Sequence, residues 1–176
     1  MKILLFGDIA AGKTTISNIL KQQYSDFEVV AVDAFRRELG DNTIKGEMNA
    51  LKKFITHIEK DKNQIIEASG LGKLGIDIFK KISNLNDVVL LIILHIPIKE
   101  VNKRIENRIW NIPFPGKQEK LNEIILSVNS KIKAGEITAM WTGLEKTTIL
   151  KTENINKEDQ GFIIKTITNF IYKHKK

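Results

Sequence analysis

Residues 7–14, Gly-Asp-Ile-Ala-Ala-Gly-Lys-Thr, have the spacing G-x-x-x-x-G-K-[ST] of a phosphate-binding loop. Gly7 and Gly12 allow backbone angles that bring main-chain N–H groups close to an anion. Lys13 supplies a mobile positive charge for the β- and γ-phosphates, and the Thr14 hydroxyl is an oxygen ligand of the kind that Mg²⁺ prefers. These residue types predict a site for ATP and Mg²⁺, in which the nucleotide contacts Gly7, Ala10, Ala11, Gly12, Lys13, Thr14 and Thr15.

The residues on either side of this loop place it between a strand and a helix. Residues 2–6 form a short apolar run that is typical of a buried strand. From residue 15 to residue 24 the apolar side chains Ile16, Ile19 and Leu20 recur at helical spacing. The N-terminus of such a helix carries partial positive charge, so the loop lies where a phosphate would be stabilised.

Apolar runs alternate with helical patterns along the rest of the chain, which is typical of a parallel sheet covered by helices. The expected strands are residues 2–6, 28–32, 64–67, 88–95 and 147–150. The expected helices are residues 12–24, 35–39, 44–60, 76–82, 99–110, 118–133 and 160–173. This order predicts an α/β fold with a five-stranded parallel sheet.

A proline-rich segment interrupts the helical pattern late in the chain. Residues 111–116 contain two of the three prolines and separate two expected helices. We interpret the region of about residues 104–118 as a helical lid. No linker or internal repeat divides the chain, so we expect one domain over residues 1–176.

Composition limits the class of protein. The chain has 176 residues and no cysteine, which excludes disulfides and thiolate metal sites. The longest apolar run, residues 88–94, is too short to span a membrane, and no signal-peptide pattern precedes the first strand. We therefore expect a cytoplasmic protein with no membrane partner. The formal charge of +7 favours a polyanionic partner without specifying one, because a biased genome also produces an excess of lysine.

Arginine is rare and occurs in two pairs. The chain has 24 lysines but only four arginines, which are Arg36 with Arg37 and Arg104 with Arg108. A planar guanidinium group binds phosphate through two parallel hydrogen bonds, which lysine cannot reproduce. We therefore expect the two pairs to contact phosphate groups, and surface salt bridges are the alternative.

Asp33 directly follows the strand expected at residues 28–32. Ligands gather at the carboxyl ends of parallel strands, so Asp33 should share an edge of the sheet with the phosphate-binding loop. A carboxylate there can accept the proton of an acceptor hydroxyl during phosphoryl transfer. Arg36 follows three residues later, on the same face of a helix that begins there, and can hold a phosphate of the acceptor. The alternative is that Asp33 is a helix N-cap with Arg36 as its solvent-facing neighbour.

Glu67 is the second candidate metal residue besides Thr14. It ends the strand expected at residues 64–67, where its carboxylate can contact the water shell of Mg²⁺. An ordinary turn at the end of the strand is the alternative.

Arg104 and Arg108 lie four residues apart on one expected helix face, directly before the proline-rich segment. Closure of the lid would bring both guanidinium groups over the transferring phosphoryl group, where they would neutralise charge and exclude water. The alternative is an ion pair between Arg104 and Glu100, which also lies four residues away.

The chain resembles the P-loop kinases, the group that includes nucleoside monophosphate kinases and polynucleotide kinases. The likeness rests on residues 7–14, on Asp33-Ala34-Phe35-Arg36 and on Arg104-Ile105-Glu106-Asn107-Arg108. The element D-x-[FY]-R looks most like the kinase domain of the phage-type 5′-hydroxyl polynucleotide kinases. The resemblance implies a P-loop NTPase fold of three α/β/α layers, in which Asp33 is the general base, Arg36 contacts the acceptor's phosphate, and Arg104 and Arg108 are lid arginines.

Two features depart from this pattern. Asp8 places a negative charge beside the phosphates, for which the sequence offers no reason. The segment Glu67-Ala68-Ser69-Gly70 does not match the element that follows the third strand in either group of kinases.

We therefore expect an ATP- and Mg²⁺-dependent kinase whose acceptor is the 5′-hydroxyl of a polynucleotide. Asp33 favours a hydroxyl acceptor, because a phosphate acceptor is already ionised and needs no base. The alternative acceptor is a nucleoside monophosphate, a nucleoside or another small molecule. Adenine contacts are expected near residues 152–156, in the loop after the last strand.

Two other classes of function stay open. Residues 156–159, Asn-Lys-Glu-Asp, match the guanine-binding pattern N-K-x-D and allow a GTP-dependent switch. A non-catalytic module that keeps only the phosphate-binding loop is the third possibility.

Overall fold

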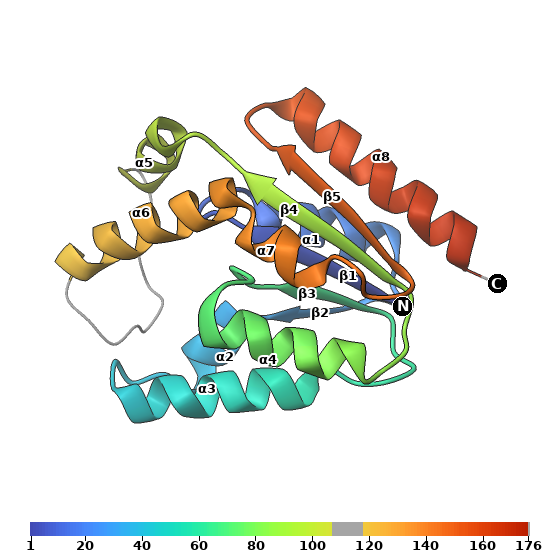
Figure 1. Ribbon diagram of the computed structural model, residues 1–176, viewed down its shortest axis with the longest axis horizontal. Helices are drawn as coiled ribbons and strands as arrows, with labels where there is room; N and C mark the ends of the chain where they lie inside the picture. Colours follow the sequence, from blue (N-terminus) through green and yellow to red (C-terminus); the bar gives the residue numbers. More distant parts are fainter. Residues whose placement is uncertain (107–117, 176) are drawn as a thin grey trace.

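The structure is a computed structural model that describes residues 1–106 and 118–175, without the side chains of residues 118–121. Within these residues, five parallel strands form one sheet in the order β2-β3-β1-β4-β5 (Figure 1). The strands are β1 (Lys2–Gly7), β2 (Glu28–Ala31), β3 (Gln64–Glu67), β4 (Val89–His95) and β5 (Thr147–Glu153). The expected α/β fold with a five-stranded parallel sheet is confirmed.

Helices cover both faces of this sheet. They are α1 (Lys13–Gln23), α2 (Val32–Leu39), α3 (Ile44–His57), α4 (Gly72–Ser83), α5 (Ile98–Glu106), α6 (Gln118–Ala134), α7 (Glu136–Trp141) and α8 (Lys157–His174). The helices α2, α3, α4 and α7 pack against one face, and α1, α5 and α8 pack against the other. The helix α6 contributes buried side chains to both cores.

The central strand β1 explains why the sheet forms here. All six of its residues are buried, and alternate side chains enter the two cores, with Leu4 and Phe6 on one face and Ile3 and Leu5 on the other. A strand that is covered on both faces needs a continuous apolar run, which is what the sequence has at this position. Because β1 pairs with both β3 and β4, the loop after it emerges at the middle of the sheet edge.

Several boundaries differ from the sequence expectations. The helix α2 already begins at Val32, so Asp33 lies in its first turn and Ala31 is the N-cap. The alternative that Asp33 caps this helix is therefore wrong. The helix α4 begins at Gly72 rather than at residue 76, and α7 was not expected.

The short helix α7 has a clear packing role. Its last residue, Trp141, is completely buried and makes edge contacts with the rings of Phe6 and Phe79, at centroid distances of 6.0 and 5.2 Å. Aromatic pairs of this geometry stabilise a core beyond their buried area.

Among the described residues, no helix is both long enough and apolar enough to cross a lipid bilayer.

Candidate functional site

The phosphate-binding loop runs from the end of β1 to the start of α1 and has glycine where the backbone requires it. Gly7 has a φ of +137°, and a Cβ there would overlap the main-chain oxygen of Leu94 on β4. Gly12 has a φ of +86°, and a Cβ there would lie 2.6 Å from Asn154 Nδ2. Any larger residue at either position would therefore push the loop away from its neighbours.

The loop and the first turn of α1 suit a bound phosphate. Gly12 is the N-cap of α1, which has no side-chain cap and no acidic residue in its first turn. Its first N–H groups and the positive end of the helix dipole therefore favour an anion. Lys13 Nζ donates to the carbonyl oxygens of Gly7 and Asp8 at 3.1 and 2.6 Å, which keeps its charge over the loop. The residues present fit the triphosphate of a nucleotide.

Glu67 and Thr14 meet beside this loop. Thr14 Oγ1 donates to Glu67 Oε2 at 2.8 Å, and Ser17 Oγ donates to Glu67 Oε1. Glu67 ends β3, which pairs with β1, so its buried carboxylate reaches the first turns of α1. A threonine hydroxyl and a carboxylate are oxygen ligands that suit Mg²⁺. Sequence reasoning missed Ser17, although it lies three residues after Thr14 and hence on the same helix face.

The structure supplies a reason for Asp8. Its Oδ2 accepts hydrogen bonds from the main-chain N–H of Ile96 at 2.9 Å and from His95 Nδ1 at 2.8 Å. The side chain is only 1% exposed, and its Oδ1 has no partner within the described residues. Asp8 thus connects the phosphate-binding loop to the end of β4. The place of His95 at the end of β4 is the only sequence signal for this structural contact.

Asp33 and Arg36 lie at the neighbouring strand end and interact with each other. In the sheet register Ala31 pairs with Glu67, which in turn pairs with Leu5, so Asp33 belongs to the same edge as the phosphate-binding loop. Arg36 Nη1 donates to Asp33 Oδ1 at 3.1 Å. The structure therefore places Asp33 and Arg36 together, at the edge of the sheet from which the phosphate-binding loop emerges.

Arg36 has a second partner that sequence reasoning did not find. Its Nε lies 3.0 Å from Glu47 Oε2, and its Nη2 lies 2.6 Å from Glu47 Oε1. Burial alone would lower the pKa of Arg36, but the hydrogen bonds and charge of Glu47, followed by those of Asp33, more than offset it and raise the pKa. Arg36 therefore stays charged, and its partner comes from α3, eleven residues away.

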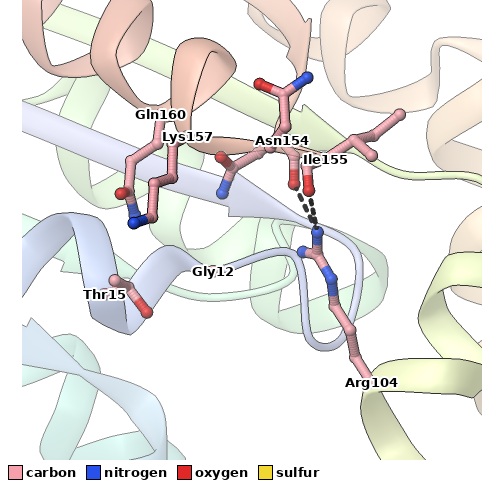
Figure 2. A pocket seen from close by; sticks show the side chains of 8 residues that line it. Gly12, Thr15, Arg104, Asn154, Ile155, Lys157 and Gln160 are labelled. Carbon is pink, nitrogen blue, oxygen red and sulfur yellow. Dashed lines mark hydrogen bonds between the residues drawn. The ribbon is translucent and has the colours of Figure 1, made fainter.

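Arg104 connects three segments of the chain. Its Nε donates to Glu100 at 2.7 Å, which is the ion pair considered above as the alternative. Its Nη1 donates to the carbonyl oxygen of Ala10. Its Nη2 donates to the carbonyl oxygens of Asn154 and Ile155, as Figure 2 shows. Arg104 thus links α5 to the phosphate-binding loop and to the loop between β5 and α8. Arg108 and most of the expected lid lie outside the described residues.

A pocket of about 280 Å³ opens beside Arg104. Gly12 and Thr15 line it from the start of α1, and residues 154–157 and Gln160 line it from the start of α8 (Figure 2). Ligand pockets commonly begin at about 300 Å³, so this volume suits one part of a nucleotide rather than the whole. It includes three of the residues at which adenine contacts were expected.

The residues that match N-K-x-D close the first turn of α8. The Asn156 side chain accepts from the main-chain N–H groups of Glu158 and Asp159, and Asp159 Oδ2 accepts from the N–H groups of Ile155 and Asn156. This is a reciprocal capping box, in which two side chains satisfy the free N–H groups of a helix start. Helix capping therefore accounts for both residue types at this position.

No protein-family model matches the sequence, and a comparison with curated protein sequences finds no match. Solved structures do share the fold. A shikimate kinase from Bacteroides thetaiotaomicron matches with a TM-score of 0.61 and 12% identity, over 98% of each chain. A deoxyadenosine kinase from M. mycoides with bound dATP has a TM-score of 0.59 and 17% identity, over 96% of this chain and 100% of its own.

A gluconokinase from Sinorhizobium meliloti 1021 also matches, with a TM-score of 0.58 and 12% identity over 98% of this chain and 97% of its own. This chain has the fold of the P-loop kinases. The match extends over almost the whole of each chain, so it includes the sheet, the phosphate-binding loop and the helices on both faces.

Proposed function

We propose that this protein is an ATP- and Mg²⁺-dependent kinase that transfers the γ-phosphoryl group to a hydroxyl group of a small molecule. The observation that carries the proposal is the 2.8 Å hydrogen bond between Thr14 Oγ1 and Glu67 Oε2. It joins the Thr14 hydroxyl of the phosphate-binding loop to a carboxylate at the end of β3, the strand beside β1 in the sheet, and together these would hold Mg²⁺. When bound, the ion would neutralise charge on the β- and γ-phosphates.

The neighbouring strand end supplies the acceptor chemistry. Asp33 accepts the proton of the acceptor hydroxyl while that oxygen forms a bond to the γ-phosphorus. The bond from this phosphorus to the β–γ bridging oxygen breaks, which leaves ADP. Lys13 and the N–H groups at the start of α1 hold the phosphates in place during this step.

We propose different roles for the two expected lid arginines, Arg104 and Arg108. Arg104 lines the pocket beside Gly12 and organises the loop that would surround the base. We propose that it fixes the nucleotide from the base side. Contact between Arg108 and the transferring phosphoryl group stays a prediction, because Arg108 lies outside the described residues.

The acceptor is the part of the proposal that changes most from the sequence expectation. The three solved structures compared above are by name a shikimate kinase, a gluconokinase and a deoxyadenosine kinase, and these names indicate small-molecule acceptors. This likeness favours the small-molecule alternative over the polynucleotide 5′-hydroxyl. The charge of +7 gives the polynucleotide no specific support, because the lysines are distributed along the whole chain.

The test is transfer of label from γ-labelled ATP in the presence of Mg²⁺. Acceptors are polyols, nucleosides, nucleoside monophosphates and a 5′-hydroxyl oligonucleotide, each with wild-type protein and with Asp33→Asn. Label on a small alcohol that is lost in Asp33→Asn supports the proposal. Label on the oligonucleotide alone would support the 5′-hydroxyl of a polynucleotide as the acceptor. Tight ATP binding without transfer to any acceptor would indicate a non-catalytic module.

A further inference from the structure

We propose that the acceptor site selects an alcohol without a phosphate or carboxylate group, because Glu47 and Asp33 already neutralise the guanidinium group of Arg36. This inference rests on the proposed function, since it names the class of molecule that the same site phosphorylates. It also reverses the role expected for Arg36, which was contact with a phosphate of the acceptor.

The hydrogen bonds of Arg36 show how completely carboxylates surround it. Its Nε and Nη2 form a two-pronged contact with Glu47, and its Nη1 donates to Asp33. All three guanidinium nitrogens therefore have a carboxylate partner. The paired side chains of Arg36 and Glu47 are only 20% and 16% exposed, so water screens their interaction weakly.

This arrangement is unfavourable for an anionic acceptor. One guanidinium and two carboxylates give the cluster a net charge of −1. A phosphate or carboxylate of the acceptor would meet this negative charge, or it would have to displace Glu47 from a buried two-pronged pair. Removing one partner of such a pair leaves the other charge unsatisfied, which is costly. A neutral alcohol or an amino alcohol avoids both costs.

The turn of α3 that carries Glu47 also exposes apolar side chains. Ile44 and Met48 lie three residues before and one residue after Glu47, within one arc of α3. They are 73% and 65% exposed, which is unusual for apolar side chains of this size. Lys45 lies two residues before Glu47 and so on the other side of the helix from it, and its charge acts on Asp41. Ile44 and Met48 thus add exposed apolar surface on the helix that carries Glu47, which suits an uncharged molecule.

Two charged side chains on neighbouring elements have partners of their own. Lys73, at the start of α4, is paired with Asp77 at 2.8 Å. Glu67 adds a further carboxylate at the end of β3 and is engaged with Thr14. Arg37 follows Arg36 on α2 and is exposed.

The experiment compares sets of related acceptors that differ in charge. We would measure kcat/KM for label transfer to deoxyadenosine and to its 3′-monophosphate, which both keep the 5′-hydroxyl, and to glucose, glucosamine and gluconate. We expect the neutral or cationic member of each set to exceed its anionic counterpart at least tenfold. A preference for the anionic members would overturn the inference while leaving the kinase proposal intact.

Variants of the cluster make the test specific. Glu47→Gln removes one negative charge and frees part of the Arg36 guanidinium, so we expect the preference for the uncharged acceptor to fall about tenfold. Glu38→Gln is the matched control, because Glu38 lies on α2 and pairs with Lys53 at the surface, and it should leave the preference unchanged. Thermal unfolding of each variant checks that it folds.

Two outcomes distinguish a failure of this inference from a failure of the proposed function. An unchanged preference in a folded Glu47→Gln protein would contradict the role of this cluster. Bound ATP without transfer to any acceptor would contradict the proposed function, and the inference would fall with it.

Discussion

The carboxylate of Asp8 is hydrogen-bonded to the imidazole of His95, which lies 87 residues further along the chain. The contact joins the phosphate-binding loop to the carboxyl end of β4, just before α5. It explains why a negatively charged residue is compatible with this loop. The carboxylate is held at the end of β4 by His95 and by the N–H group of Ile96.

Replacing His95 by alanine should therefore destabilise the protein. Asp8 would keep only one donor in a buried site, and leaving part of a buried polar group unsatisfied costs about 1–3 kcal/mol. We expect the free energy of unfolding to fall by that amount in urea denaturation. The control is His57→Ala, because His57 contacts Glu28 near the surface and its loss should cost less than about 1 kcal/mol. Equal effects of the two changes would argue against a structural role for the Asp8 contact.

Glu67→Gln should weaken the binding of Mg²⁺ to the protein. Glutamine has the shape of glutamate and can still contact Thr14 and Ser17, but it lacks the negative charge that attracts the ion. We expect the Mg²⁺ concentration for half-maximal turnover to rise about 10–100-fold, the range typical of altered metal surroundings. ATP binding measured without metal should stay within about twofold of wild type, which is far below one tenfold step of 1.4 kcal/mol.

Ser17→Ala is the companion variant for this prediction. It removes the second hydrogen bond to Glu67 and leaves the contact between Glu67 and Thr14 in place. A smaller increase in the Mg²⁺ requirement is expected. If Ser17→Ala had the larger effect, Glu67 would have a packing role rather than a role at the metal.

Arg104→Ala should weaken ATP binding. Arg104 donates to main-chain carbonyls of Ala10, Asn154 and Ile155, and these contacts shape the pocket next to Gly12. Loss of charge-assisted hydrogen bonds costs about 1.5–3 kcal/mol, which corresponds to an increase in the Kd for ATP of about 10–100-fold. Isothermal titration with ATP measures the change.

Arg104→Lys separates charge from geometry in the same measurement. Lysine keeps the positive charge but cannot reproduce a planar fork that reaches two loops. We expect it to bind ATP almost as weakly as Arg104→Ala does. Arg37→Ala is the control, since Arg37 is exposed on α2 and should leave ATP binding unchanged. Wild-type affinity in Arg104→Lys would show that charge alone matters there.

The sequence was most informative where function depends on local patterns. The phosphate-binding loop is a contiguous motif, and the place of Asp33 follows from the rule that strand ends share an edge. The i,i+4 pair of Glu100 and Arg104 was likewise visible from spacing. Each of these predictions needs only a short window of sequence and one rule of geometry.

What the sequence did not reveal depends on contacts between distant segments. Glu47 reaches Arg36 from a different helix, and His95 reaches Asp8 across the sheet edge. The helix α7 is short, and burial of Trp141 against Phe6 and Phe79 accounts for it better than any periodic pattern. Such partners follow from packing in three dimensions, which no spacing rule encodes.

The match to N-K-x-D yields a last prediction, about nucleotide preference. Asp159 accepts hydrogen bonds from the N–H groups of Ile155 and Asn156, so its carboxylate is used for capping α8. Asp159→Ala should lower the free energy of unfolding by about 1 kcal/mol, the usual loss for a helix cap. The ratio of GTP to ATP affinity, measured by competition for binding, should stay at the wild-type value because no base contact is lost. The control Glu158→Ala, which removes an exposed neighbour, should change neither the free energy of unfolding nor the affinity ratio. A selective loss of GTP binding in Asp159→Ala would instead support the hypothesis of a GTP-dependent switch.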